Sequence, residues 1–233
     1  MRLRSLIPAA LACIALSGCV TLLPKAEPSA LYKLAIDAPR TDRPDAPVKL
    51  NILRAPTAFV RMAAGDQIVT ISGAETASIE GARWAAPAPI MFDEQIITAF
   101  DASPKLRLQT RGGVTAPDAT LRVEVRTFEA RYAEAPIAPK TKSDAKADAK
   151  AFDKRRPPTV VVEIKATLTY PADAARVAEQ FLHAEVPASE NRVGAIVTAY
   201  DAATTQVLKG LVTWAEGLPP PPAKPVPQSA SPR

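Results

Sequence analysis

The alternation of apolar and polar residues between Val160 and Tyr170 constrains the fold of this chain more than any other feature. Every second residue from Val160 onward is apolar, and charged residues or threonines occupy most positions between them. A period of two is that of a β-strand with one buried face and one face at least partly in water. Residues 171–173, Pro-Ala-Asp, predict a turn, so residues 176–186 are expected to return as an antiparallel strand.

Shorter segments repeat this period. Residues 121–126 alternate and are expected to be the first of three long strands in antiparallel succession. Residues 31–36 and 48–52 also alternate and predict two strands nearer the N-terminus. Residues 68–72 and 75–80 flank a glycine and predict a hairpin.

Two segments have the apolar spacing of helices. Pro87 and Pro89 stand where a helix can begin, and this helix is expected to end before Pro104. Ser189 is expected to cap a second helix that ends at Gly217. Acidic residues are expected in the two first turns, namely Asp93, Glu94 and Glu190. The two apolar stripes consist of Phe92, Ile96, Ile97 and Phe100, and of Val193, Ile196, Val197, Tyr200, Val207, Leu208 and Leu211.

The order of these elements predicts the fold class. Strands come first, then a helix, a run of long antiparallel strands and a final helix. We therefore expect one α+β domain over residues 30–217, with a mixed, largely antiparallel sheet and two helices packed on one face.

The N-terminus has the features of an exported chain. Two arginines precede an apolar run from Leu6 to Leu16, which is too short to span a bilayer but has the length of a signal-peptide core. Leu16-Ser17-Gly18-Cys19 follows and resembles the lipobox of bacterial lipoproteins. We predict a lipoprotein signal peptide at residues 1–18, lipidation of Cys19, and a tether at residues 19–29. The alternative is an ordinary cleaved signal with an incidental cysteine.

The lipobox resemblance also implies a location. Three acyl chains on Cys19 would anchor the protein stably on a membrane without a spanning segment. Val20 follows the cysteine where an aspartate would favour retention at the inner membrane in enterobacteria. The expected location is the outer membrane, on its periplasmic face.

The basic charge is confined to one segment. The net charge is +5, but residues 140–156 hold seven basic and three acidic side chains, and the signal peptide holds two arginines. The rest of the chain is close to neutral, so no nucleic-acid partner is expected. We predict that residues 136–158 form an inserted solvated loop, which could alternatively contact anionic headgroups or an acidic partner. Residues 218–233 are rich in proline and predict a disordered tail.

Candidate catalytic groups are scarce. The chain has one histidine and two cysteines, which leaves little for a metal site or a cysteine-histidine pair. His183 shares its strand face with Glu179 and Glu185, where a lone histidine is more often a surface residue than a general base. No phosphate loop or nucleophile motif accompanies it. We expect no enzyme activity, no cofactor and no metal.

These features together resemble a known family. The lipidation site Cys19, the tether, the strand Leu31-Tyr32-Lys33-Leu34, the tripeptide Arg83-Trp84-Ala85 before the first helix, and the long hairpin before the last helix are similar to the ABC-type transport auxiliary lipoproteins. That family includes the paraquat-inducible protein C lipoproteins, and the likeness covers residues 30–216.

The resemblance implies a function. It implies a non-catalytic, lipid-anchored docking subunit of an envelope lipid transport system, with ABC transporter components and an MCE-domain protein as partners. Arg83 and Trp84 are candidate partner contacts, although Trp84 could simply close the core. Self-association into a homo-oligomer is also plausible.

Two other functions remain open on the sequence. An outer-membrane lipoprotein could regulate a peptidoglycan synthase, although a tether of about ten residues allows only a short reach. Alternatively, lipid could bind directly in an apolar groove between sheet and helices.

Overall fold

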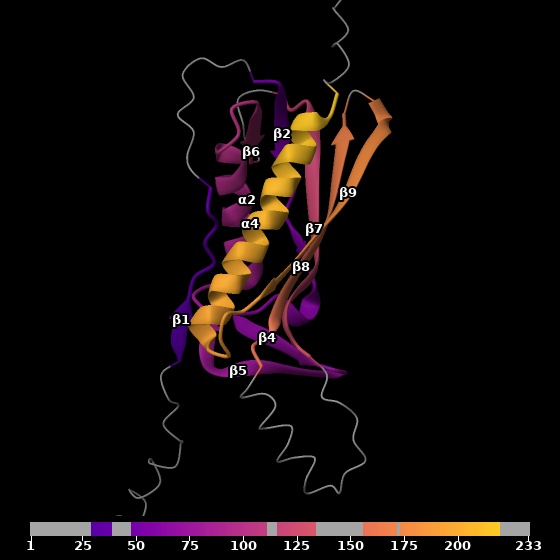
Figure 1. Ribbon diagram of the computed structural model, residues 1–233. Coiled ribbons are helices and arrows are strands. Elements are labelled where there is room, and N and C mark those ends of the chain that lie inside the picture. Colours follow the sequence, from indigo (N-terminus) through magenta and orange to yellow (C-terminus); the bar gives the residue numbers. More distant parts are fainter. Residues whose placement is uncertain (1–28, 39–47, 111–115, 134–155, 172, 220–233) are drawn as a thin grey trace, which may run out of the picture.

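The fold is α+β, with two helices on one face of a mixed sheet, as predicted (Figure 1). The computed structural model describes residues 29–38, 48–110, 116–133, 156–171 and 173–219. The predicted signal peptide, Cys19 and most of the tether lie outside the described residues, as do nearly all of the basic segment and the proline-rich tail.

Three long strands form one side of the sheet, and the last of them is an edge strand. Strand β7 (Ala119–Tyr132) pairs antiparallel with β8 (Thr159–Tyr170), and β8 pairs antiparallel with β9 (Asp173–Pro187). This confirms the predicted antiparallel succession. The register of β7 shifts between Val125 and Thr127, so Phe128 lies in the core although its parity in sequence differs from that of Val125.

The second edge of β7 is shared by three short strands. Strands β2 (Leu50–Arg54), β3 (Ala58–Phe59) and β4 (Gln67–Ser72) pair with it one after another, all parallel to it. Strand β6 (Leu106–Gln109) extends the sheet beyond β2, also in parallel. Strands β3 and β6 were not predicted, because two to four residues are too few to establish a period.

The predicted hairpin is present as β4 and β5 (Glu75–Trp84). Gly73 lies in its turn with a φ of 57°, in the left-handed region that favours glycine. Strand β1 (Ala30–Tyr32) pairs parallel with the end of β5 and forms an edge of the sheet. The strand predicted over residues 31–36 therefore ends at Tyr32.

The two helices are α2 (Ala88–Asp101) and α4 (Val193–Gly217), and a 3₁₀ turn, η2 (Arg61–Ala63), precedes β4. Ser189 does not cap α4, which begins four residues later without a side-chain cap. The Ala188 N–H donates to the Pro158 carbonyl at 2.9 Å and keeps the chain beside the sheet there. The three acidic residues expected in the first turns do not lie there either, because Asp93 and Glu94 come later in α2 and Glu190 precedes α4. Asp93 instead pairs with Arg54.

Five aromatic rings from separate elements meet at the centre of the core. The pairs have centroid distances between 4.7 and 6.1 Å, most of them edge to face. They join the parallel strands, the hairpin and both helices into a single core, and they are Phe59, Trp84, Phe92, Phe128 and Tyr200.

Candidate functional site

The structure separates the two residues predicted as partner contacts. Trp84 is only 2% exposed and packs against Tyr200 and Phe128, so its side chain belongs to the core. Arg83 points away from the core, and its guanidinium lies 3.0 Å from an oxygen of Asp66. The alternation of β5 thus places one of the two residues inside and the other on the surface.

Arg83 belongs to a small surface patch at the N-terminal edge strand. Leu31 pairs with it across β1 and β5, and 67% of Leu31 is exposed. We call Leu31, Asp66 and Arg83 the N-terminal patch. It combines an apolar side chain with an exposed ion pair, which is a composition suited to a docking surface. It also lies directly beside the point where the tether enters the domain.

After β1 the chain continues as an extended strap, residues 33–38, which runs beside the two helices (Figure 1). Three successive backbone N–H groups of the strap donate to side chains of the helices. Those of Ala35 and Asp37 donate to Asp201 and Thr205 of α4, at 2.8 and 3.1 Å, and that of Ile36 donates to Gln95 of α2, at 3.2 Å. These polar side chains therefore accept the backbone hydrogen bonds of the strap, as the carbonyl groups of a neighbouring strand would in a sheet.

Apolar contact adds to this attachment. Leu34 is 4% exposed and belongs to the hydrophobic core, and Ile36 packs partly buried against it. Burial also raises the pKa of Asp201, against the opposing effect of the hydrogen bond from the Ala35 N–H. The strap thus fixes the N-terminal segment to α2 and α4 by packing as well as by hydrogen bonds.

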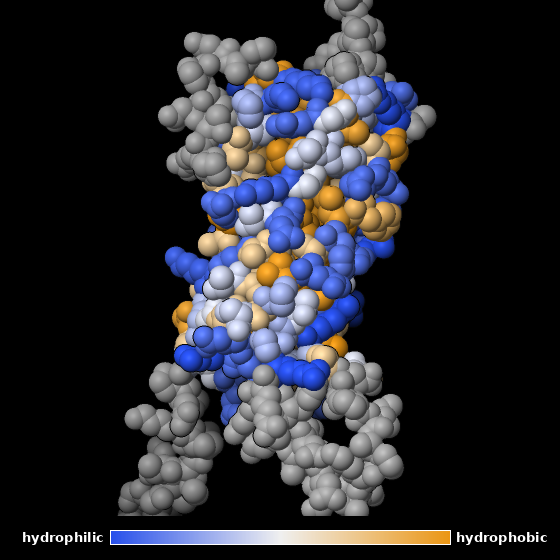
Figure 2. Space-filling model, in the orientation of Figure 1, coloured by the Kyte–Doolittle hydropathy of each residue, from blue (hydrophilic) through white to orange (hydrophobic). Residues whose placement is uncertain are grey.

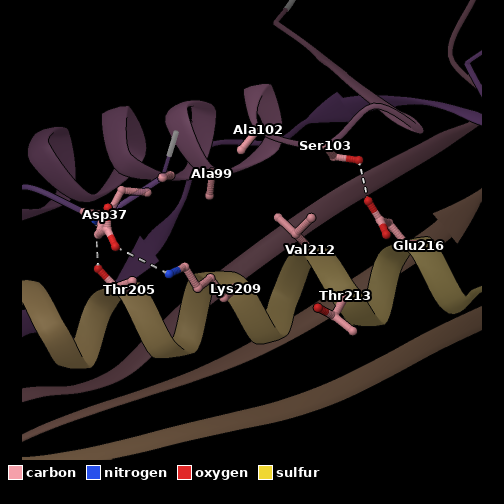
Figure 3. A pocket seen from close by; sticks show the side chains of 11 residues that line it. Asp37, Ala99, Ala102, Ser103, Thr205, Lys209, Val212, Thr213 and Glu216 are labelled. Atoms are coloured by element: carbon pink, nitrogen blue, oxygen red, sulfur yellow. Dashed lines mark hydrogen bonds and ion pairs between the residues drawn. The ribbon is translucent and has the colours of Figure 1, made fainter. Parts of the chain in front are cut away.

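A pocket of about 290 Å³ opens between α2 and α4 at the end of the strap (Figure 3). Its apolar wall comes from the small side chains of Ala99 in α2 and Ala102 just after it, and from Val212 of α4. Because these side chains are small, the two helices leave a hollow there.

The charged groups of this pocket already have partners. Lys209 Nζ lies 3.8 Å from an Asp37 oxygen. Glu216 accepts a hydrogen bond from the Ser103 hydroxyl at 2.6 Å and lies 3.6 Å from Lys105 Nζ (Figure 3). None of the residues that line the pocket is a histidine or cysteine. The arrangement can hold the strap and the helix ends together, because its charged groups are bound to neighbouring side chains.

The single histidine of the chain lies on an exposed face of β9. His183 lies on the face predicted for it, with Nε2 3.1 Å from Glu185 and Nδ1 3.7 Å from Glu163. Within the described ranges, no three histidine, cysteine, aspartate or glutamate side chains gather as a metal site. In the same part of the chain, no helix is both long and apolar enough to cross a membrane.

The strap and its partners on the helices were not predicted from the sequence. Gln95, Asp201 and Thr205 interrupt the apolar stripes of the two helices and carry no motif. These side chains accept hydrogen bonds only because the strap lies beside the helices, and the apolar period of a helix does not show which segment packs next to it.

Comparison with known proteins places the chain in a family. The family model described as the ABC-type transport auxiliary lipoprotein component matches residues 32–212. A comparison with curated proteins found no match. Among solved structures, a Xanthomonas campestris protein of family DUF330 has a TM-score of 0.62 and 25% identity, covering 80% of this chain and 94% of its own. An uncharacterized protein has a TM-score of 0.58 and 14% identity, covering 81% and 99%.

Proposed function

Since this chain belongs to the family of ABC-type transport auxiliary lipoprotein components, we propose that it is a lipid-anchored periplasmic docking subunit of an ABC and MCE-type lipid transport system. The family match over residues 32–212 carries this proposal, because it spans the described domain from β1 into α4. The acyl chains on Cys19 hold the subunit on the outer membrane, and the lipid itself passes through the partner proteins.

The arrangement of the N-terminal segment supports this function. A lipidated Cys19 would be joined to β1 by about ten residues, so the anchored residue and the N-terminal patch are close in sequence. Beyond β1 the strap is attached to both helices through Ala35, Ile36 and Asp37. A force applied through the tether is therefore transmitted to the helices and the core, as an anchoring subunit requires.

The absence of a catalytic role is part of the proposal. The charged side chains of the pocket bind one another and the strap, and His183 lies between two surface carboxylates. The family description names an auxiliary component. We infer that the domain acts by binding to other proteins and performs no reaction on the lipid.

Site-specific photocrosslinking in intact cells tests this function. A photoreactive amino acid replaces Leu31 or Arg83 in the full chain, and mass spectrometry identifies the adducts. The matched control is Arg107 of β6, which is exposed at the opposite edge of the sheet. We expect adducts with an MCE-domain or ABC transporter component from the N-terminal patch and none from Arg107. Adducts with a peptidoglycan synthase, or no adducts at all, would overturn the proposal.

The anchor has its own test. Replacing Cys19 with alanine removes the only acylation site of the predicted mature chain, so we expect the protein to be lost from the outer-membrane fraction. The unmodified protein is expected to fractionate with the outer membrane. Recovery of the Cys19→Ala variant with the outer membrane would contradict lipidation at this residue.

A further inference from the structure

Strand β9 leaves a long edge of the sheet open. Within the described part of the chain, only β8 pairs with β9, and their register runs without a shift from Val177 to Pro187. An edge of this length exposes a row of backbone donors and acceptors. Natural proteins usually shorten, bend or cover such an edge. A regular open edge of about ten residues therefore needs an explanation.

Apolar side chains accompany this edge on both faces of the sheet. On the face without helices, Phe181 is 54% and Val177 50% exposed. On the helix side, Leu182 is partly buried beside Gly210 of α4. Figure 2 shows hydrophobic surface between the upper half of α4 and the strands beside it. A covering strand would remove apolar surface from water on both sides.

Cations surround the exposed aromatic ring. The Arg126 guanidinium lies 4.9 Å and the Lys165 ammonium 5.7 Å from the centroid of Phe181. Lys165 also lies 2.6 Å from Glu179. The ring is thus held at a fixed place on the sheet surface, at the middle of the open edge, and it presents its remaining surface outward.

We propose that β9 pairs antiparallel with β9 of a second copy of this chain, with Phe181 opposite Phe181 at a twofold axis. In this register Glu179 of each copy faces His183 of the other copy, and Val177 faces Glu185. The two aromatic rings become neighbours across the axis. The symmetry also creates two Glu179–His183 pairs, one on each side of the axis, and His183 is the only histidine of the chain.

The two adjacent registers lack this complementarity. A centre one residue later, at Leu182, places Glu179 opposite Glu185, which sets two like charges against each other. A centre one residue earlier, at Gln180, places Glu179 opposite Phe181 and leaves the histidine opposite Val177. The side chains of β9 therefore favour the Phe181 register over its neighbours, and this self-complementarity is the reason to assign the edge to a second copy and not to an unrelated strand.

Membrane anchoring favours the pairing and fixes its orientation. Two anchored copies share one surface, which raises their effective concentration. The twofold axis is perpendicular to the sheet at β9, so the two tethers leave from opposite ends of the dimer. Both reach one membrane only when the sheet lies along its surface. This last step rests on the proposed anchor at Cys19, whereas the β9 pairing does not.

Disulfide trapping in cells tests the register. In the Phe181 register, Phe181→Cys brings two cysteines directly opposite each other, within the Cα separation that a disulfide allows. Glu179→Cys alone places its two thiols about 13 Å apart along the strands, which is too far. We expect full-length Phe181→Cys to run at twice the monomer mass on non-reducing gels of whole membranes. Glu179→Cys, Arg107→Cys and the unmodified chain are expected to remain monomeric.

A mixed pair supplies the decisive check. Co-expressed Glu179→Cys and His183→Cys chains are expected to form a disulfide dimer, although neither does so alone. A Phe181→Cys product that remains monomeric, or that contains a different protein, would overturn the proposal. Dimers of Glu179→Cys alone would assign a different register and would equally overturn it. Failure here leaves the crosslinks at the N-terminal patch unaffected, because that patch lies on another edge.

Discussion

Trp84 and Tyr200 meet edge to face, with their ring centroids 5.2 Å apart and their planes at 88°. This contact joins the end of the first hairpin to the last helix, which are more than one hundred residues apart in sequence. The Tyr200 hydroxyl, fully buried, donates a hydrogen bond to the Val69 carbonyl of β4 at 3.2 Å. One side chain thus holds three elements of the core together.

This environment predicts a loss of stability in alkali. Burial, and then the charge of Glu129, raise the pKa of Tyr200 well above 10.0. Above about pH 10 the unfolded chain loses this proton while the folded chain keeps it, so the free energy of unfolding falls by about 1.4 kcal/mol per pH unit from this group. In Tyr200→Phe this slope is expected to disappear, at a cost of about 1 kcal/mol at neutral pH for the lost hydrogen bond. Urea denaturation across this range measures both effects, and equal slopes in the two proteins would contradict the prediction.

The ion pair between Arg54 and Asp93 connects β2 to α2. Arg54 Nη1 lies 2.6 Å from Asp93 Oδ1, and the two side chains are only 15% and 26% exposed. Thr57 also donates a hydrogen bond to this carboxylate. Asp93→Ala would leave the guanidinium poorly solvated and unpaired, and it is expected to lower the free energy of unfolding by about 3 kcal/mol. Asp66→Ala, which breaks the exposed pair with Arg83, is the control and is expected to cost less than about 1 kcal/mol. Equal costs in urea denaturation would show that burial is not the cause.

Asp201 permits a test of the strap. Asp201→Asn keeps an acceptor for the Ala35 N–H and removes a charge that burial disfavours, whereas Asp201→Ala removes the acceptor. A raised carboxyl pKa contributes stability that is present below about pH 3.9 and is lost as the pH rises through the folded-state pKa. At neutral pH we therefore expect Asp201→Asn to be at least as stable as the unmodified protein, and Asp201→Ala to be less stable by about 1–2 kcal/mol.

The readout for Asp201 includes the strap itself. Hydrogen exchange of the Ala35 amide, followed by mass spectrometry or NMR, is expected to speed up in Asp201→Ala and to remain slow in Asp201→Asn. Fast exchange in both variants would mean that the charge holds the strap, and slow exchange in both would mean that packing of Leu34 suffices.

Two glycines of α4 differ in the space that is available for an added methyl group. Nothing lies within 4 Å of a Cβ built at Gly194, so Gly194→Ala is expected to stabilise the helix by up to about 1 kcal/mol. A Cβ at Gly210 would lie 3.0 Å from Leu182 Cδ2 of β9. Gly210→Ala therefore gains less, because Leu182 must move, and Gly210→Val is expected to be destabilising. Thermal denaturation of the three variants checks the order, and a gain at Gly210 equal to that at Gly194 would contradict it.

The sequence predicted the long elements better than their connections. The strands around Val160 and the apolar stripe of α4 are long enough for their period to be recognised, and the structure confirms both. The three short strands beside β7 were not predicted to pair with it in parallel. An alternating pattern says which side of a strand is buried, but it does not say which strand lies next to it.

The candidate site was only partly predictable. The sequence left two interpretations for Trp84, a partner contact or a core residue. Its side chain is buried in the structure and therefore belongs to the core. The strap could not be foreseen, because its backbone binds side chains that lie on two helices far away in sequence. Lipidation of Cys19 rests on a local motif, lies outside the described residues, and stays a prediction.

The parallel strands β2, β3 and β4 share one partner strand, and this has a consequence for the order of folding. Their common partner β7 begins at Ala119, more than sixty residues after β2 begins. Until that segment is available, β2 has only β6 and β4 has only β5 to pair with, so these strands cannot join into one sheet. The assembly of the N-terminal strands therefore depends on contacts that are distant in sequence, and folding is expected to be slow. A chain that is exported before it folds would benefit from this delay, because its N-terminal strands stay separate until β7 follows them.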